Sequence, residues 1–269
     1  MKSKTGVSYG KRACIPYYGI VIGLMCLPMI LQGCVTRRVT SMAAERAGIA
    51  TGFINKRIEI DGTERRYVVY VPRQYDPEKK WPLILFLHGA GERGNDGLQQ
   101  TEVGIGRAIR KHADWFPCLV LMPQCPERMW WDGARKDVEQ TLEKTLREYN
   151  IDPDRVYLTG LSMGGYACWM YGAEHAEKFA ALMPICGGGR EKDASSLATL
   201  PIWAFHGASD DVVSPEESRK MVKAVRDAGG NIQYTEFEDT GHNSWDKAYG
   251  EEKHIKWLLQ QRRQRPPRQ

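Results

Sequence analysis

The stretch RVYLTGLSMGG, residues 155–165, joins an apolar run to a serine set among glycines. The run at 155–160 is typical of a strand buried on both faces, and the segment 163–172 is typical of a helix. Between them, Ser162 is the central residue of a G-x-S-x-G pattern. A serine nucleophile on a sharp strand-to-helix turn requires small neighbours, because the strained backbone brings adjacent residues close together. The stretch therefore predicts an α/β fold with Ser162 as a nucleophile at a helix N-terminus.

The rest of the chain repeats this alternation of strands and helices. Two alternating runs, FINKRIEI (53–60) and RRYVVYVP (65–72), flank Asp61-Gly62 and predict a β-hairpin. Six apolar runs then come singly, at 83–88, 118–123, 155–160, 180–186, 201–207 and 231–237. Helix candidates lie at 138–149, 163–172, 215–228 and 251–261. Buried strands joined by helices indicate a mostly parallel, doubly wound sheet, here preceded by an antiparallel N-terminal hairpin.

Size and charge limit the function classes. The chain has 269 residues, 42% of them hydrophobic, which suits one substantial domain. The formal net charge is +5, but basic residues gather before Cys34 and in the C-terminal run QRRQRPPRQ. The part between them is slightly acidic and has no distributed basic face of the kind that nucleic-acid binding requires. We expect no nucleic-acid partner, and the oligomeric state stays open.

The first 50 residues have the pattern of an export signal and a tether. A basic start precedes the apolar run GIVIGLMCLPMIL (19–31), which suits the core of a signal peptide better than a membrane span. The sequence LQGC then resembles a bacterial lipobox, in which the cysteine, here Cys34, carries lipid and anchors the protein to a membrane. The alternatives are a plain secretory signal or an uncleaved anchor, and Val35 after the cysteine favours the outer membrane. The predicted organisation is a signal peptide (1–33), a lipidated tether (34–50), a folded α/β domain (51–261) and a basic tail (262–269).

The four cysteines of the predicted domain are Cys118, Cys125, Cys168 and Cys186. Cys118 and Cys125 bracket a predicted strand, whose ends lie about 20 Å apart, so these two cannot bond to each other. We expect all four to be small buried hydrophobes, and a disulfide among the others stays open. No C-x-x-C pair or Cys/His cluster indicates a metal site, and no motif indicates a cofactor.

Further candidate residues follow other predicted strands. In a parallel sheet, catalytic groups gather beyond the carboxyl ends of the strands. His242 follows the run at 231–237 and is the candidate base for Ser162, since a serine hydroxyl is a weak nucleophile until a base takes its proton. Asp210 follows the run at 201–207 and is the candidate carboxylate that orients this histidine, with Asp211 as its rival. The order Ser, Asp, His along the chain is that of α/β-hydrolases.

The segments GLSMGG, HGAGERG, HGASDDVV and GHNSWD together resemble the α/β-hydrolase superfamily. The resemblance is to bacterial esterases of the predicted-peptidase or prolyl-oligopeptidase-like type. It implies that Asp210, four residues after His206, is the triad carboxylate rather than Asp211. It also implies an oxyanion hole made by the backbone N–H of Met163 and that of Ala90 or Gly91. Only about fourteen residues separate the strands where such enzymes insert a cap, so we expect no large cap domain.

An uncapped site suits a soluble ester with a bulky or planar group, such as a decorated polysaccharide. Trp130, Trp131 and Trp245 are candidate substrate contacts, although they are equally suited to core or rim packing. The remaining histidines receive no catalytic role. His88 and His206 are expected to shape loops at strand ends, whereas His112, His175 and His254 are expected in exposed helical positions.

The leading hypothesis is a serine carboxylesterase acting on short-acyl, aryl or hydroxycinnamoyl esters. The first alternative is a serine peptidase of the prolyl-oligopeptidase-like type, which the absence of room for a gating domain disfavours. The second is a lipid-anchored binding protein that has lost catalysis, which the presence of every expected triad residue disfavours. A dienelactone-hydrolase activity is disfavoured, because that family's nucleophile is typically cysteine and the residue at this position is Ser162.

Overall fold

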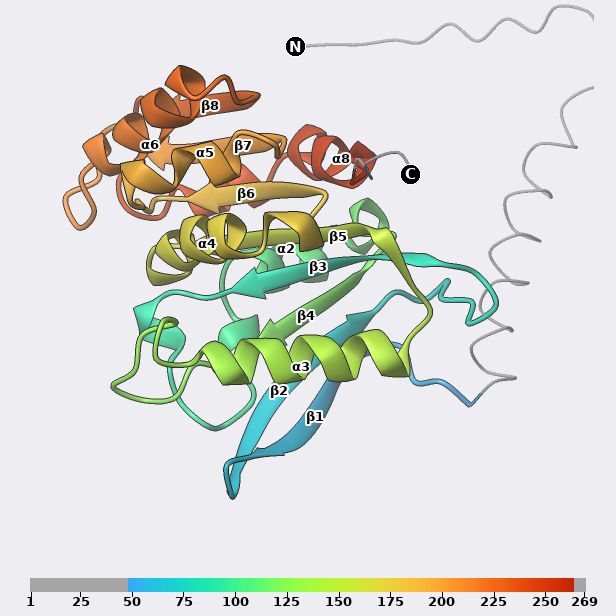
Figure 1. Ribbon diagram of the computed structural model, residues 1–269. Helices are drawn as coiled ribbons and strands as arrows, with labels where there is room; N and C mark the ends of the chain where they lie inside the picture. Colours follow the sequence, from blue (N-terminus) through green and yellow to red (C-terminus); the bar gives the residue numbers. More distant parts are fainter. Residues whose placement is uncertain (1–47, 264–269) are drawn as a thin grey trace, which may run out of the picture. The chain divides into compact units, whose positions relative to one another are not determined.

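The structure is a computed structural model that describes residues 48–263 (Figure 1). The predicted signal peptide, the lipidated Cys34 and most of the tether lie outside this range, as do residues 264–269, so these domain boundaries stay predictions. The described chain forms one eight-stranded sheet in the order β1-β2-β4-β3-β5-β6-β7-β8. Its strands are β1 (Gly52–Ile60), β2 (Thr63–Val71), β3 (Trp81–Leu87), β4 (Leu119–Pro123), β5 (Ile151–Leu161), β6 (Ala181–Ile185), β7 (Ile202–Gly207) and β8 (Ile232–Phe237).

The β1–β2 hairpin turns at the predicted position. Asp61 and Gly62 have φ angles of 49° and 73°, which the two central residues of a type I′ hairpin turn require. Strand β2 also pairs antiparallel with β4, whereas the pairs from β4 through β3 to β8 are all parallel. The expected fold class, a mostly parallel sheet with an antiparallel N-terminal hairpin, is confirmed.

Helices cover both faces of the sheet, and each face has its own core. In β3, Leu83, Leu85 and Leu87 point to one core, and Ile84 and Phe86 point to the other. The first core also contains residues of α3 (Arg135–Glu148), α4 (Met163–Glu174), α5 (Ala194–Leu197) and α6 (Glu216–Asp227). The second contains residues of α2 (Ile105–Lys111), α7 (Trp245–Tyr249) and α8 (Glu252–Gln260). Burial of both faces explains why the strands read as continuous apolar runs.

All predicted strands and helices are present, with ends that differ by a few residues. The short helices α2, α5 and α7 were not predicted, because seven, four and five residues are too few for a clear periodic pattern. The expectation for His254 was wrong: its side chain is buried, and its Nδ1 lies 2.8 Å from the carbonyl oxygen of Ala248. Within residues 48–263, no helix is long and apolar enough to cross a bilayer.

Candidate active site

Ser162 lies at the sharp turn between β5 and α4. Its backbone has φ 53° and ψ −117°, a conformation that non-glycine residues rarely adopt. Its N–H donates to the carbonyl oxygen of Ile185 at the end of β6 (3.0 Å), and its own carbonyl accepts from Tyr166 N–H in the first turn of α4 (3.0 Å). These two bonds tie the strained residue to the sheet on one side and to the helix on the other. Such strain is found at functional sites where the surroundings enforce it.

The glycines beside Ser162 permit close backbone contacts. A Cβ atom at Gly164 would lie 1.9 Å from the carbonyl oxygen of Leu87, and one at Gly160 would lie 2.2 Å from the carbonyl oxygen of Gly164. Both obstacles are backbone atoms, so a side chain at either position would force the turn apart. The G-x-S-x-G pattern therefore lets the start of α4 pack directly on the ends of β3 and β5.

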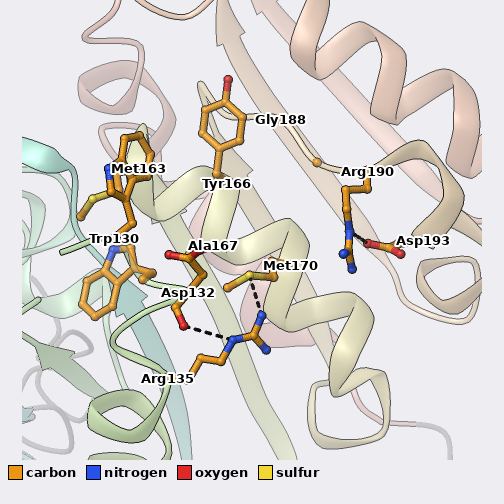
Figure 2. Close-up of a pocket in the computed structure, with 12 residues that line it drawn as sticks. Trp130, Asp132, Arg135, Met163, Tyr166, Ala167, Met170, Gly188, Arg190 and Asp193 are labelled. Carbon is orange, nitrogen blue, oxygen red and sulfur yellow. Dashed lines mark hydrogen bonds and ion pairs between the residues drawn. The ribbon is translucent and has the colours of Figure 1, made fainter.

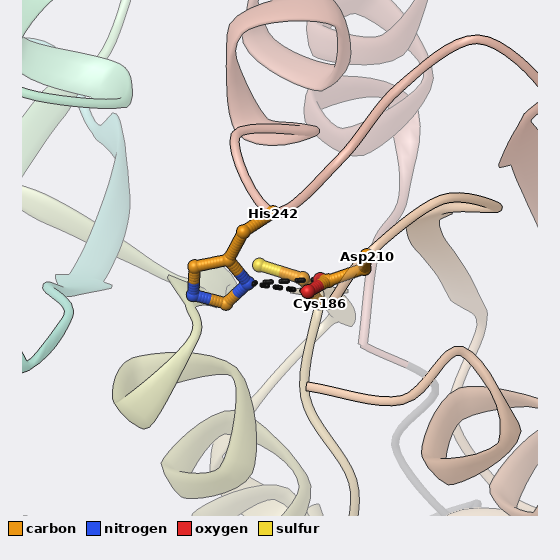
Figure 3. Close-up of side chains that lie close together, drawn as sticks. All are labelled: Cys186, Asp210 and His242. Atoms are coloured by element: carbon orange, nitrogen blue, oxygen red, sulfur yellow. Dashed lines mark hydrogen bonds and ion pairs between the residues drawn. The ribbon is translucent and has the colours of Figure 1, made fainter. Parts of the chain in front are cut away.

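The structure brings Ser162, His242 and Asp210 together in one hydrogen-bonded line. His242 Nε2 lies 2.9 Å from Ser162 Oγ, and His242 Nδ1 lies 2.8 Å from Asp210 Oδ2 and 3.1 Å from Asp210 Oδ1. Figure 3 shows the imidazole facing the carboxylate. Each residue follows a different strand: Ser162 follows β5, Asp210 follows β7 and His242 follows β8. This arrangement matches the geometry by which a histidine base, oriented by a carboxylate, activates a serine.

The surroundings of Asp210 favour the ionised form of its carboxyl group. Its side chain is fully buried, which raises the pKa of the carboxyl group, but the hydrogen bonds from His242 and from the N–H groups of Val213 and Val212 outweigh this effect. The two backbone bonds end on Oδ1, at 2.9 and 3.0 Å. The net pKa of Asp210 is lowered, so the group faces His242 as an anion.

Cys186 lies beside the Asp210–His242 pair (Figure 3). In residues 48–263 these three residues form the single group whose ligand-type atoms, all within 4.8 Å of one another, suit a metal ion. Burial raises the pKa of the Cys186 thiol to about 12, so in the metal-free site Cys186 is a protonated thiol. Asp210 and His242 are already hydrogen-bonded to each other. The arrangement therefore suits proton transfer better than metal binding.

The cysteines in the described part of the chain have the predicted character. Cys118, Cys125, Cys168 and Cys186 are all buried, and none of them is in a disulfide. Burial raises the thiol pKa of each one. They act as small hydrophobes in the two cores, as expected.

The loop after β3 carries the candidate oxyanion donors Ala90 and Gly91 and lies against Ser162. A Cβ atom at the adjacent Gly89 would be only 3.6 Å from Ser162 Cβ. Met163, which carries the other candidate donor, is the first residue of α4. Its N–H belongs to the first turn of the helix, where backbone N–H groups have no partner within the helix. The loop after β3 and the N-terminus of α4, which carry the candidate donors, thus both lie next to Ser162.

His88 fixes the loop after β3 through two hydrogen bonds of its imidazole ring. Its Nδ1 lies 2.7 Å from the carbonyl oxygen of Gly89, which can only accept, and its Nε2 accepts from the N–H of Cys125 (2.9 Å). These partners require a neutral imidazole with the proton on Nδ1. Burial lowers the pKa of His88 to about 4, in agreement with that neutral form. The expectation that His88 shapes the loop agrees with these contacts.

The burial of His88 predicts a loss of stability in mild acid. Its pKa falls from 6.5 in the unfolded chain to about 4 in the native protein, so only the unfolded chain takes up this proton as the pH drops below 6.5. His88 alone should lower the free energy of unfolding by about 2 kcal/mol between pH 7 and 5. Burial lowers the pKa of His206 and His254 as well, which adds in the same direction. Urea denaturation at pH 7, 6 and 5 measures this slope, and a flat profile over the range would contradict it.

A pocket of about 510 Å³ adjoins the nucleophile turn (Figure 2). Its floor consists of Met163, Tyr166, Ala167 and Met170, which lie on one face of α4. Trp130 borders this floor on one side, and Arg190 with Asp193 borders it on the other. The pocket is therefore mainly aromatic and apolar, with polar groups at its edge. Its lining residues are Trp130, Trp131, Asp132, Arg135, Met163, Tyr166, Ala167, Met170, Gly188, Gly189, Arg190 and Asp193.

The two arginines of the pocket are already paired. Arg190 Nε donates to Asp193 Oδ2 at 2.7 Å, and Arg135 forms an ion pair with Glu174. Arg135 Nε also donates to the carbonyl oxygen of Asp132 (3.2 Å). Both arginine charges are thus compensated by carboxylates, and the pocket suits a neutral planar group better than an anion.

The three candidate tryptophans occupy different places. Trp130 lines the pocket and is 54% exposed. Trp131 borders the same pocket but is buried, and its Nε1 donates to the carbonyl oxygen of His88 (3.0 Å). The Trp245 ring packs nearly perpendicular to the imidazole of His242, with centroids 5.2 Å apart, and does not line this pocket. Trp130 is thus the tryptophan best placed to contact a substrate.

Tyr166 and Met170 were not predicted as pocket residues from the sequence. Their signal was present, because positions 163, 166, 167 and 170 follow the spacing that places side chains on one face of a helix. Since Ser162 immediately precedes this helix, the face that begins at Met163 is the one that opens beside the nucleophile.

The fold and site define an α/β-hydrolase, and sequence comparison gives the family. The sequence model of the Esterase family matches residues 59–226, which is more than half of the chain. The chain belongs to this esterase family. Among solved structures, it is similar to a thermostable esterase, with 37% sequence identity and a TM-score of 0.73 over 78% of this chain and 63% of that one.

Other relatives are more distant. The chain is 32% identical over 179 residues to a bifunctional acetylxylan esterase/xylanase from Neocallimastix patriciarum, covering 65% of this chain and 26% of that protein. It is 26% identical to a probable feruloyl esterase C from Aspergillus terreus, covering 61% of this chain and 62% of that one. The chain thus spans a quarter to three fifths of the length of these relatives. The feruloyl esterase module from Clostridium thermocellum, solved with sinapinate, shares the fold, with 15% identity and a TM-score of 0.65 over 82% of this chain and 92% of that one.

Proposed function

We propose that this protein is a serine carboxylesterase. The observation that carries the proposal is the line from Ser162 Oγ through the His242 imidazole to the buried Asp210 carboxylate. Ser162 Oγ attacks the ester carbonyl carbon, while His242 Nε2 takes the hydroxyl proton and Asp210 stabilises the imidazolium that forms. The carbonyl oxygen becomes an oxyanion, for which the N–H groups of Met163 and of Ala90 or Gly91 are the proposed donors.

The tetrahedral intermediate then collapses to an acyl-enzyme. The alcohol leaves with the proton that His242 carried, and an acyl group remains on Ser162 Oγ. A water molecule enters, His242 takes its proton, and the resulting hydroxide attacks the acyl carbon. Collapse of the second intermediate releases the acid and returns the proton to Ser162. No cofactor takes part in these steps.

The substrates we propose are short-acyl and hydroxycinnamoyl esters, including those on decorated polysaccharides. The aromatic and apolar pocket beside Ser162 supports a planar acyl group, because an aromatic ring buried between Trp130 and the Met163–Met170 face gains stacking and apolar contact. The similarity to acetylxylan and feruloyl esterases also supports this choice. Assays on an aryl acetate, a methyl hydroxycinnamate and a peptide library test it; cleavage of peptides alone would favour the peptidase alternative.

The exposed ring of Trp130 should contribute more to esters with a hydroxycinnamoyl acyl group than to esters with an acetyl group. Trp130→Ala is expected to lower kcat/KM for methyl hydroxycinnamate about tenfold, through the loss of ring stacking. The acetyl group is too small to reach the far side of the pocket, so kcat/KM for aryl acetate should change less than twofold. Equal losses on both substrates would instead place Trp130 outside the acyl-binding region.

We also propose that the protein is exported and anchored through lipid on Cys34. The proposal rests on the sequence pattern of residues 1–34, which lie outside the described structure, and on similarity to relatives that include a secreted protein of Arthroderma benhamiae. The variant Cys34→Ser is expected to move the esterase from the membrane fraction to a soluble fraction. Wild-type protein found mainly in a soluble fraction would contradict the anchor.

A further inference from the structure

We propose that His206 is a positioning residue for the triad, one that holds the Asp210 carboxylate from the side opposite His242. This role rests on the proposed function, since it matters only if Asp210 orients a catalytic histidine. His206 lies in β7, four residues before Asp210, and both side chains are fully buried. Its Nε2 lies 3.2 Å from Asp210 Oδ2, the same oxygen that His242 Nδ1 approaches to 2.8 Å. One carboxylate oxygen therefore lies between two imidazoles.

The partners of His206 fix which nitrogen carries its proton. Nε2 faces the carbonyl oxygen of Val213 at 3.0 Å as well as Asp210 Oδ2, and both of these atoms only accept. Nε2 must therefore carry a hydrogen, which the two oxygens share. Nδ1 lies 2.7 Å from the hydroxyl of Ser218, whose single hydrogen can go either to this nitrogen or to the carbonyl oxygen of Gly187 (2.9 Å). In a neutral ring with its proton on Nε2, Nδ1 carries no hydrogen and accepts the one from Ser218. The resulting form is a neutral imidazole whose Nε2–H is directed at the carbonyl oxygen of Val213 and lies beside the Asp210 carboxylate.

The surroundings of His206 favour this neutral form. Burial lowers the pKa of His206, against the opposing influence of Asp210 and of Glu236 on the neighbouring strand β8. Glu236 is itself neutralised by Arg219 on α6, whose Nε donates to its carboxylate (3.0 Å). Because the imidazole is neutral, His206 adds a hydrogen-bond donor to Asp210 without adding a second positive charge beside His242.

His206 also fixes the segment that carries Asp210. The Asp210 carboxylate accepts from Val212 N–H and Val213 N–H, while the Val213 carbonyl faces His206 Nε2. On the other side of the His206 ring, Nδ1 lies beside Ser218 Oγ. Ser218 Oγ in turn lies 2.9 Å from the carbonyl oxygen of Gly187. Gly187 packs on Gly165 in the first turn of α4, where a Cβ atom would be 2.5 Å from backbone. The contacts thus link Asp210 to the helix that begins after Ser162.

The test uses His206→Leu and His206→Gln in the full-length protein. Leucine removes the donor, whereas the amide of glutamine can place an N–H near the position of Nε2. His206→Leu should lower kcat on aryl acetate about tenfold, the effect expected for one hydrogen bond to a charged group, with KM nearly unchanged. The acid limb of its pH–rate profile should move to higher pH, because a carboxylate with one donor fewer holds the His242 proton more strongly. His206→Gln should recover most of kcat and the wild-type limb.

A purely structural role for His206 would lower the stability of both variants and leave the pH–rate profile of the folded enzyme in place, which would overturn the inference. If His206→Leu does not fold, ¹⁵N NMR of histidine-labelled wild type decides, with His206→Gln to assign the signal. A neutral His206 protonated at Nε2 is expected, and protonation at Nδ1 alone would contradict the proposal. Inactive wild type that a fluorophosphonate does not label would instead mean that the proposed function itself has failed.

Discussion

Ser162→Ala is expected to lower kcat on any ester substrate by about 10⁵- to 10⁶-fold. The hydroxyl is the atom that becomes acylated in the proposed mechanism, and no neighbouring group can replace it. Substrate binding should survive, because the pocket beside Met163 is intact, so KM should change little. Steady-state kinetics on purified protein measure both values, with enzyme concentration high enough to detect the residual rate.

The matched control is Ser162→Gly. Both variants lack the nucleophile and should be equally inactive, but glycine adopts φ 53° without strain, whereas alanine does not. Ser162→Gly should therefore unfold at a higher temperature than Ser162→Ala. Substantial esterase activity in either variant would show that the nucleophile lies elsewhere.

Asp210→Asn is expected to reduce kcat about 10³- to 10⁴-fold while leaving the fold intact. The amide of asparagine can donate to His242 Nδ1, which favours the tautomer whose Nε2 carries a proton. Nε2 would then face Ser162 Oγ as a donor and could not accept the hydroxyl proton. Ser162 would keep its position but lose its base.

Asp211 provides the matched control for this change. It is the next residue along the chain, but its side chain is exposed and it does not take part in the hydrogen bonds to His242. Asp211→Asn should keep kcat within about twofold of wild type, as expected for a surface substitution. A reversal of the two results, with Asp211→Asn the inactive variant, would refute the assignment of the carboxylate.

Much of the fold could be predicted because strands buried on both faces are apolar throughout. The run at 155–160 leads directly into the nucleophile turn, so the strand and the turn could be predicted together. Glycines are required in this turn because backbone atoms approach as closely as those of Gly164 and Leu87. The order of the strands could not be predicted, since β4 lies between β2 and β3 only through pairings that the sequence pattern does not encode. Short helices such as α7 could not be predicted, because they are too short to show a helical periodicity.

The candidate site also has parts that could be predicted from the sequence and parts that could not. Ser162, Asp210 and His242 were predicted because each follows a strand, and parallel strands bring such positions to one edge of the sheet. The pocket was only partly predicted, because the spacing along α4 marks one face of the helix but does not show that Trp130 and Arg190 lie on either side of that face. The contact of His206 with Asp210 was not predicted, because it depends on two side chains turning toward each other within the buried end of β7.

The proposed function requires that Ser162 is an activated nucleophile. Labelling the full-length protein with a fluorophosphonate, followed by peptide mass spectrometry, tests it without knowledge of the natural substrate, because only an activated serine reacts efficiently. We expect one adduct per chain, on the peptide containing Ser162, and no adduct in Ser162→Ala or His242→Ala. Folded wild-type protein that remains unlabelled, or that carries the adduct on another serine, would contradict it.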